Sequence, residues 1–150
     1  MRINYPVVGC EPLKIMLSME GYLQRCGLEK PLLDLVKMRA SQINGCAYCL
    51  DMHSKDAGAA GETEQRLYLL NAWREAPFYN DREPAALEWT ETLTLISQQH
   101  VTDAMYDRVR SQFSEKELVD LTYAVMAINA WNRLAISMRS EPGHYKPAAR

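Results

Sequence analysis

The chain has 150 residues, of which 47% are hydrophobic and 24% are charged, and its formal net charge is −2 at pH 7. This length fits one domain, 1–150, that buries a core without needing a disulfide or a metal for stability. The 17 basic and 19 acidic residues are interspersed, and no apolar run is long enough to cross a bilayer, which argues against nucleic-acid and membrane partners.

Apolar residues recur at intervals of three and four along the whole sequence, and no segment alternates as a strand does. The chain is therefore predicted to be all-α, a single helical domain of about six to seven helices. The first helix is expected from near Pro12 to Gly27, since glycine suits a left-handed cap. The second is expected over 31–44 and the third over 46–60.

The middle of the chain carries helix signals separated by a loop. A fourth helix is expected over about 63–74, followed by a loop at 76–81. Pro84 then stands where a first-turn proline belongs and opens a helix that continues to Ile96. Thr102 is expected to cap a short helix after it.

The last and longest helix is predicted over about 115–138, because Ser114 and Glu117 have the spacing of a capping box. Three polar residues interrupt its apolar sequence: Asn129, Asn132 and Arg133. Polar groups in so apolar a helix need partners, so they either form an internal hydrogen-bond network or meet another subunit. A structural role is favoured over catalysis. The tail from about 140, rich in proline and glycine, is expected to be loosely held.

One cluster in the chain looks reactive: Cys46, Cys49 and His53. Residues three and four apart are neighbours on a helix surface, so Cys46 meets Cys49 and Cys49 meets His53. The first turn of a helix favours an anion, which lowers the pKa of a thiol placed there. His53 is four positions from Cys49 and seven from Cys46, so Cys49 is the better activated thiol. Cys46 is then placed to act as the resolving cysteine, which forms a disulfide with Cys49 once Cys49 is oxidised.

This arrangement fits reduction of a hydroperoxide. Attack by Cys49 on a peroxide oxygen gives a sulfenic acid, which condenses with Cys46 to a disulfide and water. Turnover then needs an external dithiol electron donor, of the lipoyl type or a protein dithiol, that attacks the disulfide. No bound cofactor is expected.

Other interpretations of the cysteines stay open. A Cys-x-x-Cys pair with a histidine also binds zinc, but only three ligands are clustered, since His100 and His144 are distant in sequence. Simple packing is the second alternative. Cys10 and Cys26 stand alone and are expected to behave as small hydrophobic residues. No secretory signal is visible, so a cytoplasmic location with reduced thiols is expected.

The segment from Asp34 to His53, DLVKMRASQINGCAYCLDMH, strongly resembles the core motif of the AhpD-like branch of the carboxymuconolactone decarboxylase superfamily. Residues 113–122 and 128–133 look like the closing helix of the same branch. The resemblance covers most of the chain. It implies an all-helical fold and a homo-oligomer, a trimer or a hexamer.

In peroxidases of this family a glutamate, two cysteines and two histidines form a proton relay. By resemblance, Cys49 is the attacking cysteine, Cys46 is its resolving partner and His53 is the base. Two positions differ from the pattern, because Asp34 replaces the glutamate and Tyr48 replaces the intervening histidine. Asp34 would then reach His53 through a water molecule, and the Tyr48 hydroxyl would donate a hydrogen bond.

The sequence therefore predicts a thiol-dependent hydroperoxide reductase of the antioxidant, alkylhydroperoxidase type. The Cys-x-x-Cys pair favours thiol chemistry over the decarboxylation typical of other superfamily members. An alternative is a muconolactone-type small-molecule enzyme that uses His53 and Asp34 as acid and base. A third is a non-enzymatic redox sensor whose disulfide state changes a partner surface.

Overall fold

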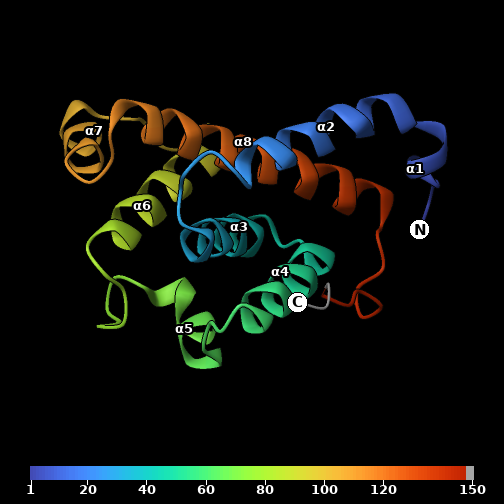
Figure 1. Ribbon diagram of the computed structural model, residues 1–150, viewed down its shortest axis with the longest axis horizontal. Helices are drawn as coiled ribbons and strands as arrows, with labels where there is room; N and C mark the ends of the chain where they lie inside the picture. Colours follow the sequence, from blue (N-terminus) through green and yellow to red (C-terminus); the bar gives the residue numbers. More distant parts are fainter. Residues whose placement is uncertain (148–150) are drawn as a thin grey trace.

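The computed structural model describes residues 1–147, and this part of the chain is helical, without strands. The all-α prediction is confirmed. The helices, shown in Figure 1, are α1 (Tyr5–Val8), α2 (Cys10–Leu23), α3 (Lys30–Asn44), α4 (Ala47–Ala59), α5 (Glu64–Tyr68), the 3-10 turn η1 (Leu70–Ala72), α6 (Arg82–Thr94), α7 (Asp103–Arg110) and α8 (Glu115–Met138).

The N-terminal part of the chain differs from the sequence prediction in one missed helix and one helix end. Helix α1 was missed because it is four residues long and buries none of them, so it leaves no apolar periodicity. Helix α2 ends at Leu23, with Gln24 as its C-cap, and Gly27 takes its positive φ of 105° in the following turn.

The expected helix over 63–74 is two short pieces, α5 and η1. Thr63 caps the first piece, since its hydroxyl accepts a hydrogen bond from the Arg66 N–H at 3.3 Å. Across the whole segment the buried apolar residues recur at every third position: Leu67, Leu70 and Trp73. That spacing matches three residues per turn, so a 3-10 turn keeps all three side chains on the core.

Helix α3 is the central element of the fold. It contacts α4, α6 and α8, and Figure 1 shows it nearly end-on among them. Apolar side chains are buried around most of its circumference: Leu32, Leu33, Leu35, Val36, Met38 and Ala40. Because α3 is enclosed on several sides, its last turn is held in place, and the cysteine segment that follows that turn is positioned by it.

Helix α8 carries the capping box that the sequence predicts. The Ser114 hydroxyl accepts from the Glu117 N–H at 3.3 Å, and the Glu117 carboxylate accepts from the Ser114 N–H at 2.7 Å. Thr102 caps α7 in the same way, through the Met105 N–H. From this start α8 runs along α2, α3 and α6 and reaches α4 near the cysteines.

The segment after α8 returns across α4. The Gly143 N–H donates to Asp51 at 2.9 Å, the Tyr145 hydroxyl donates to Asp56 at 2.8 Å, and Lys55 donates to the Tyr145 carbonyl at 3.2 Å. Its described part is thus fastened to α4, whereas the sequence led us to expect a loosely held tail; residues 148–150 lie outside the described residues. Tyr145 is thereby placed beside the cysteine helix.

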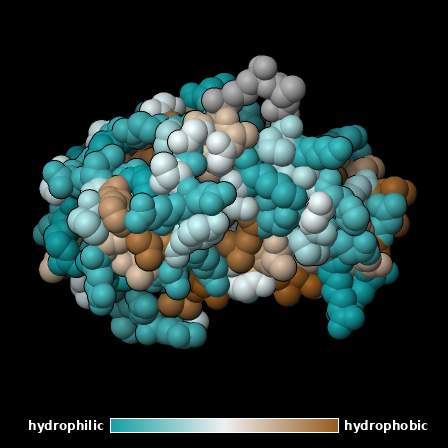
Figure 2. Space-filling view, turned by 90° about the horizontal axis from the view of Figure 1, so that it is seen from below, coloured by the Kyte–Doolittle hydropathy of each residue, from teal (hydrophilic) through white to brown (hydrophobic). Residues whose placement is uncertain are grey.

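The surface is mostly polar, with local apolar regions. Figure 2 shows one largely hydrophilic face on which hydrophobic residues gather toward the lower edge of the view. Between α2 and α8 a groove of about 220 Å³ is lined mainly by apolar side chains, among them Ile15, Met19, Tyr123 and Met126. In the described range no helix has both the length and the apolar character needed to cross a membrane.

Candidate thiol site

A turn of two residues separates the central helix from the cysteine helix. Gly45 ends α3 with φ 69° and ψ 34°, the left-handed conformation that glycine adopts most easily. The next N–H, that of Cys46, donates to the Ser41 carbonyl at 3.0 Å. The tight turn leaves Cys46 as the N-cap of α4, fixed against the last turn of α3.

The two cysteines meet at the start of α4, as predicted. Their sulfur atoms form the Cys46–Cys49 disulfide, and the Cys46 sulfur also accepts a hydrogen bond from the Cys49 N–H at 3.3 Å. Both residues are nearly inaccessible, with exposed fractions of 1% and 2%. In residues 1–147 no group of three or more His, Cys, Asp or Glu side chains is arranged to hold a metal ion.

His53 lies one turn beyond Cys49 on the buried face of α4, which continues with Ala57. No described residue forms a hydrogen bond with its imidazole. Burial, together with the positive charges of Lys37 and then Lys30, lowers the pKa of His53 to about 3. The imidazole is therefore neutral near pH 7 and keeps an unprotonated nitrogen.

A cavity of about 420 Å³ opens beside Cys49; we call it the thiol cavity. Cys49, His53 and Tyr48 line it, whereas Cys46 does not. Its other lining residues are Tyr5, Leu17, Glu20, Gln24, Lys37, Met52, Asp56, Trp131, Ala135 and Tyr145. Of the two cysteines, Cys49 is therefore the one that a molecule in this cavity would meet.

Asp34 lies in a second, adjoining cavity of about 340 Å³, which we call the carboxylate cavity. His53 lines both cavities, so the structure does bring Asp34 and His53 to one space, but Asp34 does not line the thiol cavity. Its carboxylate accepts from Lys30 at 2.6 Å. Burial raises the pKa of Asp34 more than the bond from Lys30 lowers it.

Tyr48 is half-buried on the wall of the thiol cavity, next to the two cysteines and Ala135. Burial raises the pKa of its hydroxyl, and the neighbouring Tyr5 and Asp51 add to the shift. The phenol therefore holds its proton at neutral pH. Tyr48 thus has a hydroxyl that is able to donate a hydrogen bond where the family pattern has a titratable imidazole.

An ion pair in the thiol cavity was missed from the sequence. Lys37 of α3 donates to Glu20 of α2 at 2.6 Å, and Trp131 of α8 donates to the other Glu20 oxygen at 3.0 Å. One sequence signal was available, because Lys37 is a charged residue one turn after Asp34 on a helix that is otherwise mostly apolar. Glu20 and Trp131 are 111 positions apart, and no local pattern pairs them.

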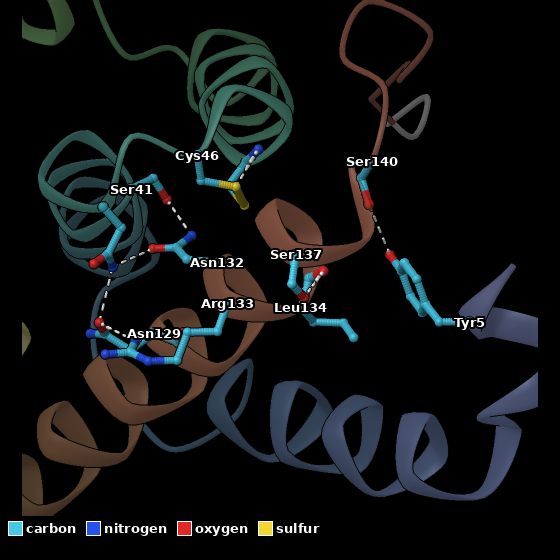
Figure 3. The surroundings of a disulfide bond; sticks show 11 residues. Tyr5, Ser41, Cys46, Asn129, Asn132, Arg133, Leu134, Ser137 and Ser140 are labelled. Atoms are coloured by element: carbon cyan, nitrogen blue, oxygen red, sulfur yellow. Dashed lines mark hydrogen bonds between the residues drawn. A yellow bond between two sulfur atoms is a disulfide. The ribbon is translucent and has the colours of Figure 1, made fainter. Parts of the chain in front are cut away.

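Asn129 and Asn132 of α8 form a hydrogen-bond network with α3, one of the two alternatives left open above, and the exposed Arg133 joins it at the surface. Figure 3 shows Asn132 reaching from α8 toward Ser41, to which it donates at 3.0 Å. Asn44 donates to Asn132 at 2.8 Å and to Asn129 at 3.0 Å. Arg133 also donates to Asn129, at 2.9 Å. The network holds the last turn of α3, from which the Cys46 turn departs.

Comparison with known proteins places this site in a family. The sequence profile of the carboxymuconolactone decarboxylase family matches residues 13–92, which include both cysteines and His53. The chain belongs to this family. The uncharacterized protein YdfG of Bacillus subtilis is 46% identical over 137 residues, which are 91% of this chain and 93% of YdfG.

Similarity to solved structures places this chain in the AhpD-like branch of the family. A protein of unknown function from Agrobacterium tumefaciens, named as a candidate AhpD antioxidant defence protein, is 41% identical with a TM-score of 0.91, covering 96% of this chain and 99% of that one. A peroxidase-related protein from Silicibacter is 24% identical with a TM-score of 0.80, covering 90% and 72%. The debrominase Bmp8 is 17% identical with a TM-score of 0.76, covering 91% and 74%. The last two similarities concern the fold alone.

Proposed function

We propose that this AhpD-like protein is a thiol-dependent hydroperoxide reductase. One observation carries the proposal: Cys49, which is bonded to Cys46, lines a cavity together with a buried, neutral histidine. The cavity gives a hydroperoxide access to one sulfur. Cys46 does not line the cavity but is bonded to Cys49, and its role is to complete the disulfide.

In the reduced protein, His53 accepts the thiol proton of Cys49. The thiolate attacks the terminal oxygen of the hydroperoxide, a sulfur–oxygen bond forms and the oxygen–oxygen bond breaks. The products are a Cys49 sulfenic acid and an alcohol. Cys46 then attacks the Cys49 sulfur, and the sulfenic hydroxyl leaves as water with the Cys46 proton.

Reduction of the disulfide requires an external dithiol, of the lipoyl type or from a protein. A thiolate of the donor that enters the thiol cavity attacks Cys49, and Cys46 is the leaving thiolate. The second donor thiol then releases Cys49 and completes the donor's own disulfide.

Titration of the reduced protein tests the proposal. Addition of hydrogen peroxide or cumene hydroperoxide should give the Cys46–Cys49 disulfide, detected by mass spectrometry of peptides. Cys49→Ser should abolish peroxide consumption, whereas Cys46→Ser should leave Cys49 to over-oxidise to the sulfinic acid. If the wild-type protein forms no disulfide, or if both variants behave alike, the proposal is wrong.

The acid–base alternative rests on a separate observation, which is that Asp34 and His53 line the same carboxylate cavity. Decarboxylation of a muconolactone-type substrate that survives replacement of both cysteines would support it. The redox-sensor alternative predicts cysteine oxidation without turnover by any dithiol.

We further propose that the chain forms a homo-oligomer, a trimer or a hexamer, as the family resemblance implies. The apolar groove between α2 and α8 supplies a surface that a second copy would cover. Light scattering of the purified protein measures the mass directly. A monomer at micromolar concentration would contradict the proposal.

A further inference from the structure

The thiol cavity contains a charged pair that the steps above leave without a role. The side chains of Lys37 and Glu20 are only 13% and 18% exposed, and their charged atoms are 2.6 Å apart. Trp131 bonds the second Glu20 oxygen, so side chains from α2, α3 and α8 hold the pair. Burying two charges is costly, and apolar residues would pack here at less cost.

Lys37 stands between the two cavities and lines both. Its positive charge acts on both His53 and Asp34: it adds to the lowering of the His53 pKa, and it partly offsets the rise that burial causes in the pKa of Asp34. Among the described residues that line the thiol cavity, Lys37 is the cationic one. An ammonium group has three N–H donors, and of the described residues only Glu20 accepts a hydrogen bond from it.

Peroxide reduction needs a proton donor at this location. When the oxygen–oxygen bond breaks, the leaving oxygen carries the electron pair of that bond and must be protonated to become an alcohol. Burial and the nearby positive charges keep His53 neutral before the reaction starts, so that it has no proton of its own to give, and burial raises the pKa of the Tyr48 hydroxyl above its ordinary value. An ammonium group is a much stronger acid than an alcohol.

We propose that Lys37, oriented by Glu20, is the general acid that protonates the leaving oxygen of the hydroperoxide. This role rests on the proposed function above. The thiolate of Cys49 forms the sulfur–oxygen bond, the oxygen–oxygen bond breaks, and the departing oxygen takes a proton from Lys37. The neutral amine then regains the proton that His53 accepted from Cys49, so both groups return to their starting states.

A comparison of two oxidants tests this role. tert-Butyl hydroperoxide releases an alkoxide that needs a proton, whereas peracetic acid releases acetate, which needs none. In single-turnover experiments with reduced protein, Lys37→Met should slow the reaction with tert-butyl hydroperoxide about 100-fold. The same variant should slow the reaction with peracetic acid by less than about threefold, because general-acid assistance gives little to so good a leaving group.

The double variant Lys37→Met with Glu20→Gln removes both charges and keeps an acceptor for Trp131, so it should show the same selective loss without an unpaired buried carboxylate. Lys14→Met is the matched control, because Lys14 forms an exposed ion pair with Glu11 on α2. That control should react with both oxidants at the wild-type rate.

The results separate the two proposals. Equal losses with both oxidants, or no loss with either, would remove Lys37 as the acid while leaving the peroxidase proposal in place. Failure of the wild-type protein to react with either oxidant would remove both. A selective loss supports the assignment, since a change in folding or in the amount of Cys49 thiolate would slow both reactions by the same factor.

Discussion

Two buried titratable groups, Glu91 on α6 and His53 on α4, differ in how their side chains are hydrogen-bonded. Glu91 accepts hydrogen bonds from Arg39 at 2.7 Å, from Trp73 at 2.8 Å and from Arg74 at 2.6 Å. Burial alone would raise the pKa of Glu91, but these three donors outweigh it and lower the pKa. His53 has no such bond from any described residue, and burial lowers its pKa to about 3.

The difference separates stabilising groups from reactive ones. A carboxylate with three donors is locked in its charged form and contributes to the stability of the fold. A buried imidazole without a hydrogen-bond partner costs stability in acid, yet it keeps a lone pair available to a neighbouring thiol. A shifted pKa therefore indicates a reactive site only when its cause leaves the group free to react, as burial does for His53, and not when hydrogen bonds hold the group in one state, as for Glu91.

The largest expected effect is on stability at Glu91. Glu91→Gln leaves the positive charges of Arg39 and Arg74 without their counter-charge and should lower the free energy of unfolding by about 3 kcal/mol. Chemical denaturation measures this loss, and the rate of Cys49 oxidation should not change. Glu88, which lies on the same helix as Glu91, is more exposed than Glu91 and pairs with Arg108 of α7, so Glu88→Gln is the control and should have little effect. A Glu91→Gln protein with wild-type stability would contradict the stabilising role that we assign to Glu91.

The next effect is on reactivity at His53. His53→Gln should slow Cys49 oxidation by tert-butyl hydroperoxide about 100-fold, because the thiol loses its base. The free energy of unfolding at pH 7 should change little, since no hydrogen bond to a described residue is lost. His100→Gln is the control on an exposed histidine. A large loss of stability with unchanged reactivity would reverse the role that we assign to His53.

The smallest effect is the pH dependence of stability. The folded-state pKa of His53, about 3, lies below the ordinary value of 6.5, so the unfolded chain binds more protons between these two values. Stability should therefore fall as the pH drops from 6.5 toward 3, by about 2 kcal/mol on reaching pH 5. In His53→Gln this decrease should be absent. Asp34, whose pKa is raised, acts with the opposite sign and is present in both proteins, so the difference between them isolates His53.

Much of the fold could be predicted because its signals are local. The caps at Thr102 and Ser114 lie within three residues of the groups that they bond, and the Cys49–His53 face follows from the helical repeat alone. The break between α5 and η1 was missed because a spacing of three fits both an α-helix and a 3-10 turn over so short a segment.

The surroundings of the cysteines could not be predicted, because they depend on contacts between distant segments. Glu20 and Trp131 meet across 111 positions, and Tyr145 reaches Asp56 across 89. The sequence did identify Asp34 as a departure from the family pattern. It could not show that the carboxylate would lie in a separate cavity, bonded to Lys30, because that depends on how α2, α3 and α4 pack.

The hydrogen bond from Trp131 to Glu20 has an optical consequence. It fixes the indole on the wall of the cavity that Cys49 faces, whereas Trp73 and Trp89 form their hydrogen bonds outside that cavity, with Glu91 and Thr122. Since a disulfide quenches the emission of a nearby indole, the protein carries its own fluorophore beside its reactive sulfur. Oxidation and reduction of Cys49 can then be followed in real time as a change in intrinsic fluorescence, without a label or a coupled assay.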